Sequence, residues 1–132
     1  MVAITEDDHV VLVRQFRGAV ELHLLELPAG LLDVPGESLV TAAARELREE
    51  TGMAAEQWEE LTTFLAAPGM ADERVTVFMA TGLSDVGTEL HGPEEQHMEI
   101  VRLPFAEALA MTRTGGIVDA KTIIGLHLVA SR

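Results

Sequence analysis

The chain has 132 residues, a formal net charge of −13 and no cysteine. Its length and its 48% apolar content favour one folded domain over a disordered chain, and the missing cysteines exclude disulfides and thiolate metal sites, as fits a reducing cytoplasm. The acidic charge argues against binding to a nucleic-acid backbone, and no apolar run approaches the roughly 20 residues of a membrane span.

Five strands and three helices are predicted along the chain. Strands are expected at residues 9–17, 21–30, 58–67, 74–83 and 98–104. Helices are expected from a cap at Ser38 to about Thr51, with a stop at Gly52, and at 105–114 and 119–131. Loops are expected at 31–37, 68–73 and 87–97. This order predicts a mixed α/β, or α+β, fold in which helices pack on a mixed sheet.

The first predicted helix contains the stretch ARELREETGM, residues 44–53. In an α-helix Glu46, Glu49 and Glu50 share an arc of about 100°, separate from the apolar stripe that would pack on the sheet. Arg45 can reach Glu49 one turn later. Two interpretations fit the helix alone: a solvated acidic face, or carboxylates gathered for Mg²⁺, which would also bridge this acidic chain to a small phosphorylated substrate.

Glu37, eight residues before Arg45, favours the second interpretation. From Glu37 onwards the chain resembles the signature of the Nudix hydrolase family: Glu, seven residues, Arg-Glu, apolar, any, Glu-Glu, any, Gly, apolar. Six specified residues match, namely Glu37, Arg45, Glu46, Glu49, Glu50 and Gly52, where chance gives about one match in ten million starting positions. The family pattern has five residues between its first Gly and the Glu, whereas six residues lie between Gly30 and Glu37. This difference indicates a one-residue insertion in the loop.

The resemblance implies a Nudix fold, with a mixed β-sheet sandwiched between helices, and Mg²⁺ or Mn²⁺ as cofactor. By resemblance, Glu46 and Glu50 are direct metal ligands, and Glu49 is a ligand or the catalytic base. The carbonyl of Ala29, presented at the Pro28-Ala29-Gly30 turn, is a further expected ligand. The metals would screen the pyrophosphate of a nucleoside diphosphate derivative and make bound water more acidic.

The other signature residues are expected to support this site. By resemblance, Arg45 orients Glu49, and Glu37 supports the helix. Gly30 and Gly52 are expected to be structural residues of the motif, at the loop and at the end of the helix.

Residues 25–37, LELPAGLLDVPGE, look like the branch that hydrolyses ADP-ribose and related nucleoside diphosphate sugars. A proline about fifteen residues beyond Met53 marks this branch, and Pro68 stands there. The resemblance implies substrate contacts at Arg17, Pro68, Gly69 and Met70. Filling a packing gap is the favoured alternative for Met70. It also implies a metal or water ligand at Glu73.

The catalytic base of this branch usually comes from a mobile loop after the signature. The acidic loop 87–97 occupies that place, and Glu94, Glu95 and Glu99 are the candidates there or beside it, with Glu95 favoured. Closure of the loop would bring the carboxylate to the attacking water. The alternative is an ordinary solvated charged loop.

The resemblance predicts a single Nudix domain over residues 1–132 and a homodimer. Members of the branch usually carry an N-terminal β subdomain that contributes to adenosine binding. No such subdomain is expected in this sequence. The expected activity is metal-dependent hydrolysis of the pyrophosphate bond of ADP-ribose or a related compound, giving a nucleoside monophosphate and a sugar phosphate. The alternatives are a hydrolase that removes nucleoside triphosphates and a non-catalytic domain that senses a nucleotide.

Overall fold

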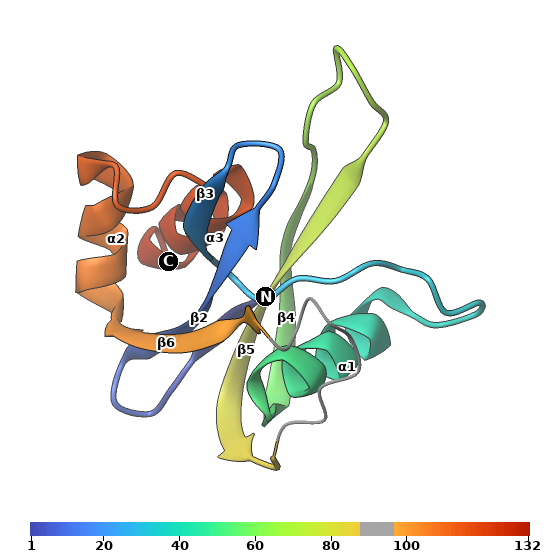
Figure 1. The fold of residues 1–132 in the computed structure, drawn as a ribbon. Coiled ribbons are helices and arrows are strands. Elements are labelled where there is room, and N and C mark those ends of the chain that lie inside the picture. Colours follow the sequence, from blue (N-terminus) through green and yellow to red (C-terminus); the bar gives the residue numbers. More distant parts are fainter. Residues whose placement is uncertain (88–96) are drawn as a thin grey trace.

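The computed structural model describes residues 1–87 and 97–132 (Figure 1). Its strands are β1 (Val2–Ile4), β2 (His9–Arg17), β3 (Leu22–Glu26), β4 (Met53–Leu65), β5 (Arg74–Asp85) and β6 (Glu99–Pro104). Its helices are α1 (Leu39–Thr51), α2 (Phe105–Thr114) and α3 (Ala120–Ala130). The described residues include no helix that is long and apolar enough to cross a membrane.

All six described strands join one mixed sheet. Its order is β3-β2-β1-β5-β4, and β6 pairs with β2. The pair β1 and β5 is parallel, and the other pairs are antiparallel. The predicted α+β class and mixed sheet are therefore confirmed.

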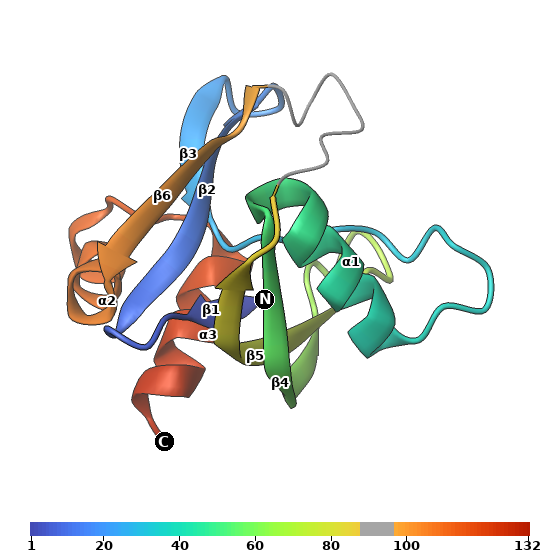
Figure 2. The same cartoon turned by 90° about the horizontal axis from the view of Figure 1, so that it is seen from below.

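Helices cover both faces of the sheet (Figure 2). Because strand side chains alternate, Val2 and Val10 contribute to a core with Leu126 of α3, whereas their neighbours Ala3 and Val11 pack with Leu47 of α1. The first core also includes side chains from the β3 end and α2. The two cores confirm the expected sandwich, and among the described helices α1 alone lies on its face of the sheet.

The helix α1 begins and ends where the sequence predicted. The side chain of its N-cap, Ser38, accepts a hydrogen bond from the backbone N–H of Thr41 at 3.2 Å. Gly52 ends it in the left-handed conformation with φ 69°, which a residue without Cβ adopts at little cost. These two caps set the length of α1.

Three strand predictions differ from the structure. The strand β1 was not predicted, because three residues are too few for a periodic pattern, although it inserts between β2 and β5. The strand β4 starts at Met53, five residues before the predicted 58, because Gly52 turns the chain directly from α1 into the sheet. The strand β3 covers Leu22–Glu26 of the predicted 21–30, so that residues 27–38 form a long connection to α1.

Candidate active site

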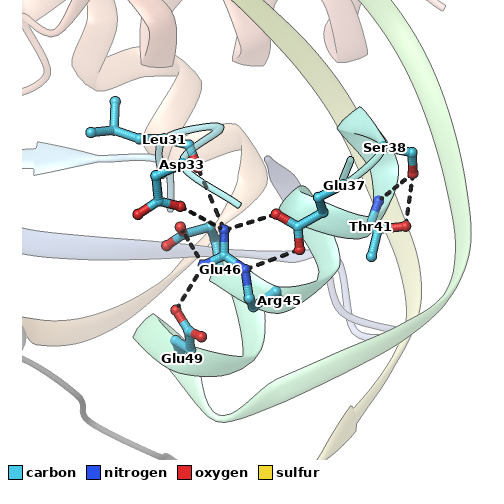
Figure 3. Close-up of polar contacts among 8 residues, drawn as sticks. All are labelled: Leu31, Asp33, Glu37, Ser38, Thr41, Arg45, Glu46 and Glu49. Carbon is cyan, nitrogen blue, oxygen red and sulfur yellow. Dashed lines mark hydrogen bonds and ion pairs between the residues drawn. The ribbon is translucent and has the colours of Figure 1, made fainter. Parts of the chain in front are cut away.

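The guanidinium of Arg45 is the centre of the acidic cluster on α1 (Figure 3). Its Nε and Nη2 donate to the two carboxylate oxygens of Glu37, each at 3.1 Å. This paired geometry fixes a planar guanidinium against a carboxylate. The hydrogen bonds to Glu37 are the main reason that the pKa of Arg45 is raised, against the effect of its partial burial. Arg45 is therefore a permanent cation among acids.

The third nitrogen of Arg45 faces two of the signature glutamates. Nη1 donates to Oε1 of Glu46 at 2.8 Å and to Oε2 of Glu49 at 3.1 Å. The second contact joins residues one helical turn apart, the pair for which the spacing predicts a contact. Through these bonds Arg45 sets the rotamers of both glutamates, and their remaining oxygens are directed away from it (Figure 3).

The long loop before α1 closes over the same guanidinium. Nη2 of Arg45 also donates to Oδ1 of Asp33 at 3.4 Å and approaches the carbonyl of Leu31 at 3.5 Å (Figure 3). The loop thus places Asp33 beside the contact between Glu37 and Arg45. Sequence analysis interpreted Asp33 as a turn residue of the 31–37 loop and did not assign it to the site, since an acid in a turn has many ordinary reasons to be there.

The turn at residues 29–30 lies directly against the outer face of α1. The backbone N–H of Ala29 donates to Oε2 of Glu50 at 3.0 Å, and the Glu50 side chain is buried. A Cβ on Gly30 would lie 1.9 Å from Cδ of Glu46. The glycine therefore leaves the space that the Glu46 carboxylate fills.

Burial is the main reason that the pKa of Glu46 is raised, and the charges of Glu49 and Asp33 act in the same direction. The bonds from Arg45 oppose this shift without cancelling it. A second cation beside Glu46 would favour its charged form. The electrostatics of this carboxylate consequently suit a bound metal ion.

The donor set is of the kind that a hard divalent cation prefers. Glu46, Glu49 and Glu50 offer hard carboxylate oxygens, and the Ala29 carbonyl belongs to the turn that contacts Glu50. Among residues 1–87 and 97–132, no three acidic or histidine side chains converge closely enough to hold a metal ion by themselves. A hexacoordinate ion that keeps several of its waters needs only one or two direct carboxylates.

Arg17 lies at the end of β2 and is held by a buried acid. Its Nε and Nη2 donate to the two oxygens of Glu26 at 2.8 and 2.9 Å. Lys121 of α3 donates to the same carboxylate. Burial opposes ionisation of Glu26, but the bonds from Arg17 and Lys121 outweigh it and lower its pKa. Sequence analysis missed Glu26 and Lys121; the one available signal was that Lys121 is the only lysine in an acidic chain.

The predicted substrate loop joins β4 to β5 at the end of a hairpin (Figure 1). Pro68, Gly69 and Met70 are exposed there, with Met70 93% exposed. The side chain of Met70 therefore fills no packing gap. Glu73 is exposed too, and no hydrogen bond or ion pair between described residues joins its carboxylate to α1. The structure thus does not bring this loop together with the acidic cluster.

Three glutamates were predicted as candidates for the catalytic base. Glu94 and Glu95 lie outside the described residues. Glu99, the third candidate, is exposed on β6 and forms an ion pair with Arg14 at 3.3 Å.

The fold is an α+β sandwich in which α1, the helix that carries Glu46, Glu49 and Glu50, covers one face of the sheet. The chain belongs to the NUDIX domain family, whose model matches residues 1–123. The family expected from the signature is thereby confirmed.

Individual relatives extend beyond this chain. It is 43% identical over 129 residues to the ADP-ribose pyrophosphatase of Mycobacterium tuberculosis (strain ATCC 25618 / H37Rv), covering 98% of this chain and 62% of that protein. It is 37% identical over 127 residues to the methanol dehydrogenase activator of Bacillus methanolicus, covering 96% and 68%. The crystal structure of an ADP compounds hydrolase superimposes with a TM-score of 0.85 at 30% identity, covering 98% and 69%. The chain thus spans about two thirds of these relatives.

Proposed function

We propose that this protein hydrolyses the pyrophosphate bond of ADP-ribose or a related nucleoside diphosphate derivative, with Mg²⁺ or Mn²⁺ as cofactor. The observation that carries the proposal is that Arg45 holds Glu46 and Glu49, while Glu50 of the same helix accepts from the backbone of the Ala29 turn. Similarity to an ADP-ribose pyrophosphatase and to an ADP compounds hydrolase supports the substrate class.

In this proposal Glu46, Glu50 and the carbonyl of Ala29 hold the metal. When bound, the metal polarises the phosphate oxygens and lowers the pKa of a coordinated water. Arg45 fixes Glu46 and Glu49 in their rotamers, so that they need no reorganisation during the reaction. Glu49, or a glutamate of the loop 87–97, accepts the proton of the attacking water.

Arg17 is proposed to bind a phosphate of the substrate. Its guanidinium is held on one edge by Glu26, and the charges of Asp119 and Glu50 also raise its pKa, which supports a position beside the acidic cluster. Pro68, Gly69 and Met70 remain proposed substrate contacts, and Glu73 a proposed metal or water ligand. Those four would need the hairpin loop to move towards α1.

The homodimer also remains a proposal, as does a cytoplasmic location. Leu31, Leu32 and Val34 are exposed in the loop before α1, and neighbouring exposed apolar side chains are typical of an association surface. Light scattering of the purified protein gives its molar mass in solution. A mass of one chain at all concentrations would contradict the dimer.

Product analysis tests the activity. The protein is incubated with ADP-ribose and Mg²⁺, and AMP with ribose 5-phosphate is the expected pair of products. Parallel reactions contain nucleoside triphosphates or EDTA. Release of inorganic pyrophosphate from triphosphates, with no reaction of ADP-ribose, would favour the triphosphate hydrolase. Tight nucleotide binding without phosphate release under any metal would favour the sensor.

A further inference from the structure

A chain of charges connects α3 with the end of β2. Glu26 is 1% exposed, and an ionised carboxylate removed from water is strongly destabilising unless it is paired. Two cations pair with it: Arg17 through two hydrogen bonds and Lys121 through one. Lys121 also donates to Asp119 at 2.9 Å. The order of charges is therefore Arg17, Glu26, Lys121, Asp119, with alternating signs.

The first turn of α3, which carries Lys121, is anchored by hydrogen bonds at both Asp119 and Thr122. Asp119 caps α3 by accepting from the backbone N–H of Thr122 at 3.0 Å. The hydroxyl of Thr122 in turn accepts from the backbone N–H of Leu27 at 2.9 Å, and Thr122 is fully buried. Leu27 precedes the Pro28-Ala29 turn of the acidic site. Lys121 consequently approaches Glu26 from a fixed backbone, 95 residues away in sequence.

Arg17 is constrained on one edge only. Glu26 occupies Nε and Nη2, and among the described residues Nη1 has no hydrogen-bond partner. The side chain is 45% exposed. A guanidinium has five N–H donors in a fixed plane, so the remaining donors can bind a second anion without releasing Glu26. Because the guanidinium is planar, the bonds of Nε and Nη2 to Glu26 also fix the direction in which the N–H groups of Nη1 point.

We propose that Glu26 and Lys121 are positioning residues, which hold Arg17 so that its open N–H donors bind a phosphate oxygen of the substrate. This inference rests on the proposed function, because a phosphate is the anion that the acidic site would present to Arg17. Lys121 acts by fixing the carboxylate plane of Glu26, and so acts on the substrate through two other side chains. The helix α3 thereby contributes to substrate binding.

The alternative hypothesis is that this network only joins β3 to α3 and adds to stability. Kinetic measurements distinguish a positioning role from this purely structural one. A phosphate contact that is present in both ground state and transition state lowers KM and leaves kcat unchanged. We therefore expect Lys121→Met to raise the KM for ADP-ribose about ten-fold with little change in kcat. Lys121→Arg, which keeps the charge and the donors, should restore the KM.

A double-mutant cycle makes the test specific. In the Arg17→Ala background, Lys121→Met should cause no further rise in KM, because its effect passes through Arg17. Arg132→Met is the charge-matched control, since it removes an exposed ion pair with Glu59. Unchanged KM in Lys121→Met, or equal effects of Lys121→Met with and without Arg17, would overturn the proposal.

Reductive methylation covers the case in which Lys121→Met does not fold. Lys121 is the only lysine, so the reaction on folded protein modifies its amine and the terminal amine alone. Dimethyl-Lys121 keeps its charge but has one N–H donor, too few for both Glu26 and Asp119. KM should rise in the native sequence and not in methylated Lys121→Arg. Equal KM values overturn the inference, whereas a native protein that hydrolyses no nucleoside diphosphate derivative overturns the proposed function and this inference with it.

Discussion

The side chain of Glu46 fills the space where a side chain on Gly30 would lie: a Cβ on Gly30 would be 1.9 Å from Cδ of Glu46 and 2.2 Å from its Oε1. Gly30 has no positive φ, so its importance comes from this contact and not from its backbone conformation. The absence of a side chain at Gly30 is therefore what allows the Glu46 carboxylate to take this position.

Gly30→Ala should lower metal-dependent turnover at least ten-fold with a small loss of stability. The added methyl group meets the end of a flexible side chain, which can rotate away at little cost in folding energy. Rotation removes the Glu46 carboxylate from the place that Arg45 gives it. Turnover at saturating Mg²⁺ and the thermal midpoint measure the two effects. Gly18→Ala is the matched control, because a Cβ there meets nothing within 4 Å. Normal turnover of Gly30→Ala would contradict the role of Glu46.

Arg45→Lys should behave as a severe substitution despite the conserved charge. Arg45 uses three nitrogens to reach Glu37, Glu46 and Glu49, and an ammonium group cannot reproduce that planar set. We expect a loss of about 1–3 kcal/mol in the free energy of unfolding, because hydrogen bonds between charged groups are lost. Turnover should fall as well, because Glu49 loses its fixed rotamer.

Urea denaturation at pH 7 measures the stability of Arg45→Lys, and Arg113→Lys, exposed in α2, is its control. A denaturation midpoint equal to that of Arg113→Lys would show that the paired geometry around Arg45 contributes no stability.

Glu50→Gln should abolish most of the metal-dependent activity while the fold is retained. The amide keeps the shape and an oxygen that can accept from Ala29, but it lacks the charge that a divalent cation needs. We expect turnover to fall about 100-fold or more. Isothermal titration with Mn²⁺ measures the affinity directly, and Glu60→Gln, exposed on β4, is the control. Normal Mg²⁺-dependent turnover in Glu50→Gln would show that Glu50 is no metal ligand.

The local features of the site could be read from the sequence because their causes are local. Ser38 and Gly52 set the ends of α1, and the helical period then places Glu46, Glu49 and Glu50 on one side of the helix. Arg45 and Glu49 meet because they are one turn apart. All of these relationships lie within fifteen residues of chain, where spacing defines geometry.

The contacts that were missed join distant segments. Glu26 stood in a predicted strand among leucines, and nothing near it in sequence shows that Lys121 lies 95 residues further along and against it. The strand β1 is short, and its place between β2 and β5 depends on tertiary pairing alone. Arg17 was recognised by its similarity to a substrate arginine, but its constraint by Glu26 required the register of β2 with β3.

The ion pairs of buried Glu26 with Arg17 and Lys121 predict a specific pH dependence of stability. The pKa of Glu26 in the folded protein lies below its ordinary value of 4.5. Above pH 4.5 the carboxylate is ionised in both states, and its pairing contributes fully to stability. As the pH falls below 4.5, the unfolded chain binds a proton first, so the contribution shrinks and is lost at the lower pKa of the folded state.

Glu26→Gln should therefore be less stable than the native sequence by about 2–3 kcal/mol at pH 7, because Arg17 and Lys121 lose their charged partner. The difference in the free energy of unfolding should narrow as the pH falls from 4.5 towards 3. Over this range Glu26 becomes protonated, so the native protein loses the stabilisation from the charged carboxylate that the variant lacks at every pH. Urea denaturation of both proteins across this range in EDTA measures it, with the exposed Glu60→Gln as control. A difference that stays constant down to pH 3 would mean that Glu26 is not held ionised by its two cations.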